Sequence, residues 1–231
     1  MTARYAIYFA PAKHSPWWRF GAGWLGRDEV SNTPLTAPTA APLDADTQQQ
    51  ITAEPRRYGF HATLKAPFRL RMGNTLDDLL VQLRRLADTL KPVALGPLHA
   101  TALGNFVALV PVLSLTDPLK LAARCVTELD ALRAPLSEAE QARRRAAPLD
   151  TRELALLALY GYPYVLERFR LHFSLTGPVA STVAEHVLEA VAEPVALLNA
   201  YTPLVLDRLS LFVEPAPGQG FTRLTDLELA G

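Results

Sequence analysis

The sequence predicts an α+β fold in which two antiparallel sheets carry helices on their outer faces. Strand-like segments and amphipathic helices alternate along the 231 residues, and 49% of the residues are hydrophobic, which is enough for a substantial core. A short polar motif also recurs, at residues 61–64 and 172–175, each time before a helix and then a pair of strands. We therefore expect one domain over residues 1–231, built from two similar lobes with pseudo-twofold symmetry and a cleft between them.

The individual elements follow from local patterns. Runs rich in aromatic and β-branched residues predict strands over residues 4–11, 60–70, 93–113 (two strands that turn at Gly104-Asn105), 204–214 and 221–229. Helical spacing and capping residues predict helices over residues 14–26, 75–91, 117–133, 138–145, 151–160 and 179–192. Ser15, Thr75, Ser137 and Asp150 are the expected N-caps. Residues 31–55 have the weakest pattern, and we expect a surface loop there with one helical turn.

Composition narrows the class of protein. The 23 basic residues balance the 23 acidic ones, which argues against long nucleic acid as the main partner but leaves room for a local basic patch. The single cysteine, Cys125, lies in an apolar helical pattern and forms no intrachain disulfide. The first residues read as a strand and not as a signal peptide, and no apolar run reaches the ~20 residues of a membrane span. We expect a soluble cytoplasmic protein, and the oligomeric state stays open.

The repeated motif has the form His-x-Thr/Ser followed by a hydrophobic residue. Because side chains alternate between the faces of a strand, His61, Thr63 and Lys65 are expected on one face of the first motif strand. His172 and Ser174 are likewise expected on one face of the second. The opposite face of each strand is apolar and suits a core. Each strand therefore presents an imidazole and a hydroxyl on its polar face, and we interpret the two as half-sites of one active site.

Two histidines on either side of a phosphate suit phosphodiester cleavage. One neutral imidazole takes a proton from the nucleophile, and the other, protonated, gives a proton to the leaving oxygen. The hydroxyls of Thr63 and Ser174 would then hold the non-bridging phosphate oxygens. This chemistry needs no metal or cofactor, and the sequence shows no metal-ligand cluster. The candidates to line the same cleft are Tyr8, Lys65, Tyr164 and Arg170.

A third His-x-Thr stands at His99-Ala100-Thr101-Ala102. It lacks the large hydrophobic residue at the fourth position, follows Pro97, and is not followed by a helix and a strand pair. We expect His99 at the surface near the start of a strand. The Arg143-Arg144-Arg145 run is expected at a solvated helix end.

The paired motifs resemble those of the 2H phosphoesterase superfamily, which is named for them. Longer sequence segments, which include the first motif, resemble those of a bacterial branch of that superfamily that is linked to phosphonate utilisation. The matching segments are Arg4-Tyr5-Ala6-Ile7-Tyr8-Phe9-Ala10-Pro11, Trp17-Trp18, Tyr58-Gly59-Phe60-His61-Ala62-Thr63-Leu64-Lys65-Ala66-Pro67-Phe68 and Gly161-Tyr162-Pro163-Tyr164. The resemblance covers essentially the whole chain. It implies a bilobal fold, metal-free phosphodiester chemistry, His61 and His172 as catalytic residues, and Thr63 and Ser174 as phosphate-binding residues.

Three functions remain open on this basis. The first is a phosphodiesterase that opens a small cyclic phosphate, such as the phosphorylated ribose 1,2-cyclic phosphate that the phosphonate association implies. The second acts on RNA ends that bear a 2′,3′-cyclic phosphate or a 2′-5′ linkage, and the zero net charge argues against it. The third is a non-catalytic module that binds a nucleotide or phosphorylated metabolite, although binding alone needs no acid and base.

Overall fold

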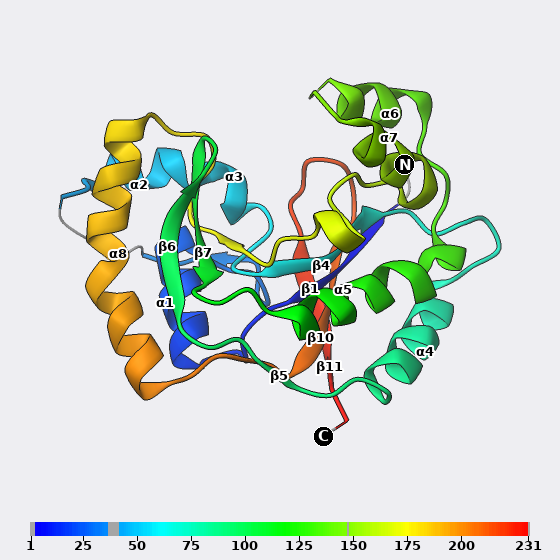
Figure 1. Cartoon of the computed structure of the whole chain (residues 1–231), viewed down its shortest axis with the longest axis horizontal. Helices are drawn as coiled ribbons and strands as arrows, with labels where there is room; N and C mark the ends of the chain where they lie inside the picture. Colours follow the sequence, from blue (N-terminus) through cyan, green and yellow to red (C-terminus); the bar gives the residue numbers. More distant parts are fainter. Residues whose placement is uncertain (1–2, 37–41, 147, 231) are drawn as a thin grey trace.

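A four-stranded antiparallel sheet in the order β11–β10–β1–β4 lies at the centre of the molecule (Figure 1). The computed structural model describes residues 3–36, 42–146 and 148–230. The strands of this sheet are β1 (Arg4–Phe9), β4 (Ala62–Phe68), β10 (Arg208–Glu214) and β11 (Thr222–Glu228). Strand β1 is buried on both faces, because Ile7 and Phe9 enter the main core while Ala6 and Tyr8 join a smaller aromatic cluster. Both sets of side chains are therefore fixed in position.

A second antiparallel sheet has the order β6–β7–β8. It contains β6 (Leu98–Leu103), β7 (Phe106–Pro111) and the short β8 (Phe173–Ser174). Gly104, with φ +65°, makes the tight turn between β6 and β7, as the Gly-Asn pair predicts. Two small ribbons pair β2 (Arg27–Asp28) with β3 (Thr33–Pro34), and β5 (Val93–Ala94) with β9 (Val205–Leu206).

The chain crosses between the sheets. Strand β4 carries the first motif, but the strand pair that follows it, β6–β7, joins the sheet of the second motif. The second motif lies at β8, and the strand pair that follows it, β10–β11, joins the sheet of the first motif. Each sheet is therefore built from both halves of the sequence. The main hydrophobic cluster also includes side chains of both sheets, so they share one core.

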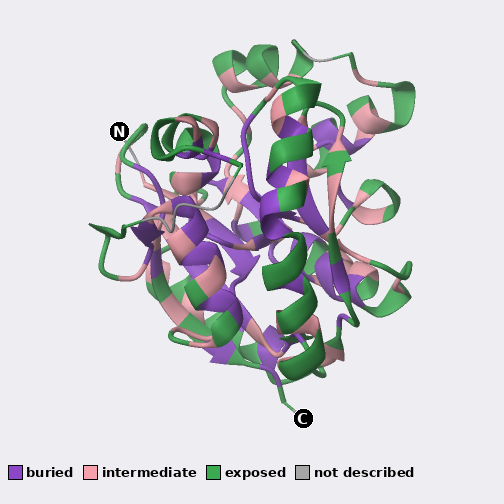
Figure 2. Cartoon of the chain, turned by 90° about the vertical axis from the view of Figure 1, so that its left-hand side faces the viewer, coloured by how far each residue is buried: buried purple, intermediate pink, exposed green. Residues whose placement is uncertain are grey.

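Helices cover these sheets. Helix α8 (Ser181–Tyr201) packs on β6 and β7, α5 (Thr116–Glu128) packs on β4, and α4 (Leu76–Ala87) packs on β10 and β11. Figure 2 shows the exposed outer face of α8. Helix α1 (Pro16–Leu25) ties distant segments together, because Trp17 Nε1 donates to Thr202 O (2.6 Å) and Trp24 Nε1 donates to Leu175 O (2.9 Å). In the described part of the chain, no helix combines the length and apolar character needed to cross a membrane.

Two further helices, α6 (Glu138–Arg145) and α7 (Thr151–Tyr160), form a separate unit at one end of the molecule (Figure 1). The remaining elements are α2 (Ala45–Ile51), α3 (Ala53–Arg56) and the 3₁₀ turns η1 (Asp130–Leu132) and η2 (Leu166–Arg168). The N-caps predicted at Ser15, Thr75, Ser137 and Asp150 are confirmed, because each side chain accepts from the backbone N–H three residues later.

The structure corrects three predicted elements. The segment over residues 31–55, expected as a loop with one turn, contains α2 and α3, and only its part at 37–41 lies outside the described residues. Asp44 caps α2, and the buried Gln48 donates to Trp24 O at 3.2 Å, so tertiary packing stabilises a helix of low intrinsic propensity. Helix α8 continues past its predicted end at 192, through Pro194. The second motif forms only a two-residue strand, and His172 precedes it.

Candidate active site

The backbone fixes the orientation of His61. Its Nδ1 lies 2.9 Å from Gly59 O, and because a carbonyl only accepts, Nδ1 carries the proton. The remaining nitrogen, Nε2, lies 3.2 Å from Thr63 Oγ1. Gly59 adopts φ +77°, and a Cβ there would lie 2.7 Å from Glu29 Cβ, so glycine is required at this turn. The motif thus presents Nε2 of His61 for proton transfer.

The ring of Tyr8 stacks against the imidazole of His61, and Tyr8 lines neither of the two cavities described below. The two rings stack with centroids 3.7 Å apart and an interplanar angle of 24°. Tyr8 is 1% exposed and faces Thr63 across the β1–β4 pair. The expectation that Tyr8 lines the cleft is therefore wrong, because its ring is covered by the imidazole.

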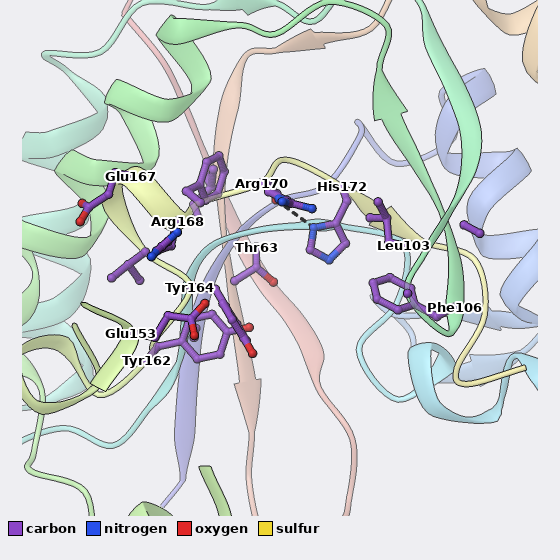
Figure 3. Close-up of a pocket in the computed structure, with 16 residues that line it drawn as sticks. Thr63, Leu103, Phe106, Glu153, Tyr162, Tyr164, Glu167, Arg168, Arg170 and His172 are labelled. Atoms are coloured by element: carbon purple, nitrogen blue, oxygen red, sulfur yellow. Dashed lines mark hydrogen bonds between the residues drawn. The ribbon is translucent and has the colours of Figure 1, made fainter. Parts of the chain in front are cut away.

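His172 repeats the arrangement of His61. Its Nδ1 lies 2.8 Å from Arg170 O, the carbonyl two residues earlier, just as His61 uses Gly59 O (Figure 3). Its Nε2 has no hydrogen-bond partner among the described residues. The flanking residues join the two motifs, because Phe60 precedes His61, Phe173 follows His172, and their rings stack at 5.1 Å. This contact fixes the two histidine-bearing segments relative to each other.

Two cavities adjoin the motifs, and each combines the histidine of one motif with the hydroxyl of the other. The larger, of about 700 Å³, is lined by His172 and Thr63 (Figure 3). The smaller, of about 290 Å³, is lined by His61 and Ser174. Phe106, at the tip of the β6–β7 hairpin, lines both, and its ring lies 5.8 Å from that of His172. The four motif side chains therefore line two cavities that share Phe106.

Burial dominates the electrostatics of both histidines. It lowers the pKa of His61 to about 4, the hydrogen bond to Gly59 opposes this shift, and the nearby His172 adds to it. Burial also lowers the pKa of His172, and the positive charge of Arg170 adds to that effect. Both imidazoles are therefore mainly neutral near pH 7 in the protein alone. A bound anion would favour the protonated form of either.

This burial predicts a specific pH dependence of stability. A histidine whose pKa is lower in the folded state favours the neutral form, so its contribution is complete above pH ~6.5 and is lost as pH falls toward 4. We expect wild-type protein to lose roughly 1 to 3 kcal/mol over this range through His61. Denaturant unfolding at several pH values measures it, and His61→Gln should make the slope smaller while leaving the part that His172 contributes. An unchanged slope in that variant would contradict the lowered pKa.

Residues 63–222 match the protein family described as "Protein of unknown function (DUF1045)". The chain belongs to this family. The matched region includes Thr63, His172 and Ser174 and begins just after His61. Most of the candidate site therefore lies within the part of the chain that defines DUF1045.

Two curated relatives of this DUF1045 chain are both named ribose 1,5-bisphosphate phosphokinase PhnN. The one from Janthinobacterium sp. (strain Marseille) is 38% identical over 231 residues, which cover 99% of this chain and 51% of that protein. The one from Laribacter hongkongensis (strain HLHK9) is 38% identical over 243 residues, which cover 99% of this chain and 53% of that protein. The chain therefore spans about half the length of the curated relatives it matches.

The predicted position of Lys65 in the DUF1045 cleft is wrong because β4 contains a bulge. Tyr8 pairs with Thr63, but the next residue back on β1, Ile7, pairs with Lys65 and not with Leu64. The extra residue reverses the alternation of side chains. Lys65 therefore lies on the face of the sheet opposite Thr63.

There, Lys65 is 3% exposed and serves the core. Its ammonium donates to Val126 O (2.9 Å) and pairs with Asp130 (3.3 Å), which joins β4 to α5 and η1. Burial lowers the pKa of Lys65 to about 8, and Asp130 opposes that shift. This lysine stabilises the packing of α5 and lines neither cavity.

Tyr164 and Arg170 line the larger cavity (Figure 3). Both are largely exposed, and Arg170 has no side-chain partner among the described residues. His99 is exposed on β6 and lines neither cavity. Among the described residues, no group of three or more histidine, cysteine, aspartate or glutamate side chains is arranged to hold a metal ion.

Sequence reasoning missed Phe106 and Tyr58. Phe106 follows the predicted Gly104-Asn105 turn, but the position of this hairpin over the motifs depends on the crossing of the chain between the sheets. Tyr58 lines the smaller cavity, with its ring 6.2 Å from that of His61. Its place directly before Gly59-Phe60-His61 is the signal that could have revealed it.

Proposed function

We propose that this DUF1045 protein is a metal-independent phosphodiesterase that opens a small cyclic phosphate. The observation that carries this proposal is the matched pair of histidines. In each, Nδ1 donates to the carbonyl two residues earlier, at 2.9 Å for His61 and 2.8 Å for His172, so Nε2 is the nitrogen that can exchange a proton. Each histidine shares a cavity with the hydroxyl of the other motif. This arrangement suits a phosphate held between two imidazoles.

The proposed reaction is general acid–base hydrolysis. A neutral imidazole removes a proton from water through Nε2 while the water oxygen forms a bond to phosphorus. The ester bond from phosphorus to the leaving oxygen breaks, and the other imidazolium protonates that oxygen. We assign His61 as the base, because its pKa of about 4 keeps it neutral. His172, whose pKa burial also lowers, is assigned as the acid on the condition that the bound anionic phosphate favours its protonated form. The hydroxyls of Thr63 and Ser174 donate to the non-bridging oxygens.

The relatives suggest the substrate. Their name gives ribose 1,5-bisphosphate as what they phosphorylate. Hydrolysis of a 5-phosphorylated ribose 1,2-cyclic phosphate at the bond between phosphorus and the oxygen on C2 would yield that compound. We therefore propose this substrate and this regiochemistry, and with them a role in phosphonate breakdown.

We propose that the kinase activity of the relatives belongs to the half that this chain does not match. The phosphate-binding sequence Gly-x₄-Gly-Lys-Ser/Thr does not occur here, since each of the lysines at 13, 65, 91 and 120 follows alanine or leucine. In the relatives, the kinase half would then phosphorylate the ribose 1,5-bisphosphate that the half matched by this chain produces.

We also propose that the two sheets are lobes of one domain over residues 1–231, related by pseudo-twofold symmetry. The repeated Nδ1 hydrogen bonds support it, as does the way each sheet combines one motif with the strand pair that follows the other. The lobes differ at the motif strand, because β8 has two residues and β4 has seven.

The first experiment is a phosphodiesterase assay with EDTA-treated protein. It compares 5-phosphorylated ribose 1,2-cyclic phosphate with nucleoside 2′,3′-cyclic phosphates, and phosphorus NMR identifies the bond that breaks. We expect the sugar substrate to be converted to ribose 1,5-bisphosphate. If the protein hydrolyses the nucleoside 2′,3′-cyclic phosphates and not the sugar substrate, its proposed function changes to hydrolysis at RNA ends. Tight binding of phosphorylated ligands with no turnover would favour the binding module.

Arg170 should assist binding of the reactive phosphate. Its charge already lowers the pKa of His172, so it lies within electrostatic reach of that imidazole. We expect Arg170→Gln to lower kcat/KM by roughly 10- to 100-fold, the loss typical of one charged hydrogen bond. The same variant should raise the pKa of His172, which NMR titration measures.

Arg168→Gln is the matched control, because Arg168 lines the same cavity but is paired with Asp150. We expect a smaller loss of kcat/KM for this variant and no change in the titration of His172. Equal losses of kcat/KM in the two variants would show that kcat/KM depends on the overall charge of the cavity and not on Arg170 itself.

A further inference from the structure

Arg144 differs from its neighbours in the Arg143-Arg144-Arg145 run. Arg143 and Arg145 are exposed, as the sequence predicts, but Arg144 is half-buried, and its guanidinium carbon lies 5.1 Å from the centre of the Tyr162 ring. Among the described residues, Arg144 has no hydrogen-bond or salt-bridge partner. The expectation of a solvated helix end is therefore wrong for this one residue.

The fold holds Arg144 in this position. Arg69, just after β4, forms a bidentate ion pair with Glu140, with Nη1 of Arg69 2.6 Å from Oε1 of Glu140. This pair lowers the pKa of Glu140 to about 2. Glu140 and Arg144 are four residues apart on α6 and so lie on the same face of the helix. The tether that docks α6 therefore also directs Arg144 toward the body of the protein.

The ring of Tyr162 connects Arg144 to the larger cavity. Tyr162 lines the larger cavity. Burial raises the pKa of Tyr8, and electrostatic interactions with Tyr58 and Tyr162 raise it further. Tyr8 in turn stacks on His61 at 3.7 Å. Tyr162 therefore interacts electrostatically with the tyrosine that supports His61 and also lies beneath Arg144.

The other arginines of this region already have acidic partners. Arg4 lies 2.6 Å from Glu214, which is fully buried, and Arg57 lies 3.6 Å from the same carboxylate. Burial lowers the pKa of Arg144, and repulsion from Arg143 and Arg4 contributes. Tyr162 and Glu140 oppose that shift, but within the described residues neither forms a hydrogen bond or an ion pair with Arg144. Arg144 is thus the guanidinium of this group that is partly desolvated without an ion-pair partner. A bound anion would offset that cost.

We propose that Arg144 and the Tyr162 hydroxyl bind a second anionic group of the substrate, a phosphate monoester, at the part of the larger cavity that Tyr162 lines. This inference rests on the proposed function, because it assumes that the same cleft holds the cyclic phosphate. It specifies the substrate class as a sugar that carries two phosphates. Arg144 is then a binding residue that sets specificity and takes no part in proton transfer.

Calorimetric binding tests the proposal without any need for turnover. Ribose 1,5-bisphosphate and ribose 1-phosphate are titrated into wild type, Arg144→Gln and Arg143→Gln. We expect wild type to bind the bisphosphate at least roughly tenfold more tightly than the monophosphate, as one charged bidentate contact provides. Arg144→Gln should abolish this preference, and Arg143→Gln, which removes the same charge from an exposed position, should retain it.

Tyr162→Phe keeps the ring beneath Arg144 and should weaken the preference only in part. A preference that survives in Arg144→Gln, or that is absent in wild type, would overturn the inference. Turnover of the cyclic phosphate is measured separately on the same proteins. Turnover without a phosphate preference defeats only the role of Arg144, whereas a phosphate preference without turnover defeats only the phosphodiesterase.

Discussion

Replacement of either His61 or His172 by alanine is expected to lower kcat by roughly 10³- to 10⁴-fold, toward the upper end of what one general acid or base contributes. Each imidazole presents Nε2 as its exchangeable nitrogen, and no other histidine lines either cavity. Because the two act as a unit, the double variant should lose little more than either single variant. The measurement is steady-state turnover of the cyclic phosphate, with circular dichroism and thermal unfolding to show that the fold persists.

His99→Ala is the matched control for these variants. His99 begins a third His-x-Thr sequence but is exposed on β6 and lines neither cavity, so turnover should stay near the wild-type value. A well-folded double variant of His61 and His172 with near-wild-type turnover would defeat the two-histidine mechanism. Loss of turnover in His99→Ala to the same extent would defeat the assignment of the site.

Gly21→Ala is expected to destabilise the protein by roughly 3 kcal/mol, near the upper range for overpacking of a core. A Cβ at Gly21 would lie 1.9 Å from Cγ of Phe60, which is fully buried. Phe60 cannot move aside without disturbing Phe173, against which it stacks at 5.1 Å. These two rings flank His61 and His172, so activity should fall as well. Thermal unfolding should show a decrease in Tm of about 6 to 12 °C.

A double variant tests the steric effect directly. Phe60→Leu combined with Gly21→Ala should lose less than the sum of the two changes, because the smaller side chain relieves the contact. If the losses of stability of the two single variants add up to that of the double variant, the clash between residue 21 and Phe60 does not cause the loss in Gly21→Ala.

The sequence by itself determined the parts of this protein that depend on neighbouring residues. The caps at Ser15, Thr75, Ser137 and Asp150 were predictable because each acts on a backbone N–H only three residues away. The alternation of polar and apolar side chains likewise indicated the strands and the α+β class. The recurrence of His-x-Thr/Ser indicated which histidines to consider together.

Tertiary structure alone decided which side chains meet. The bulge in β4 moved Lys65 to the opposite face from Thr63, because one extra residue reverses the side-chain alternation, and no local pattern indicates a bulge. Tyr8 came to lie beneath His61 through pairing between strands that are distant in the sequence. The exchange of strand pairs between sheets brought Phe106 to the motifs, and the Arg69–Glu140 pair directed Arg144 inward. Each of these depends on long-range contacts, whose partners cannot be identified from local spacing.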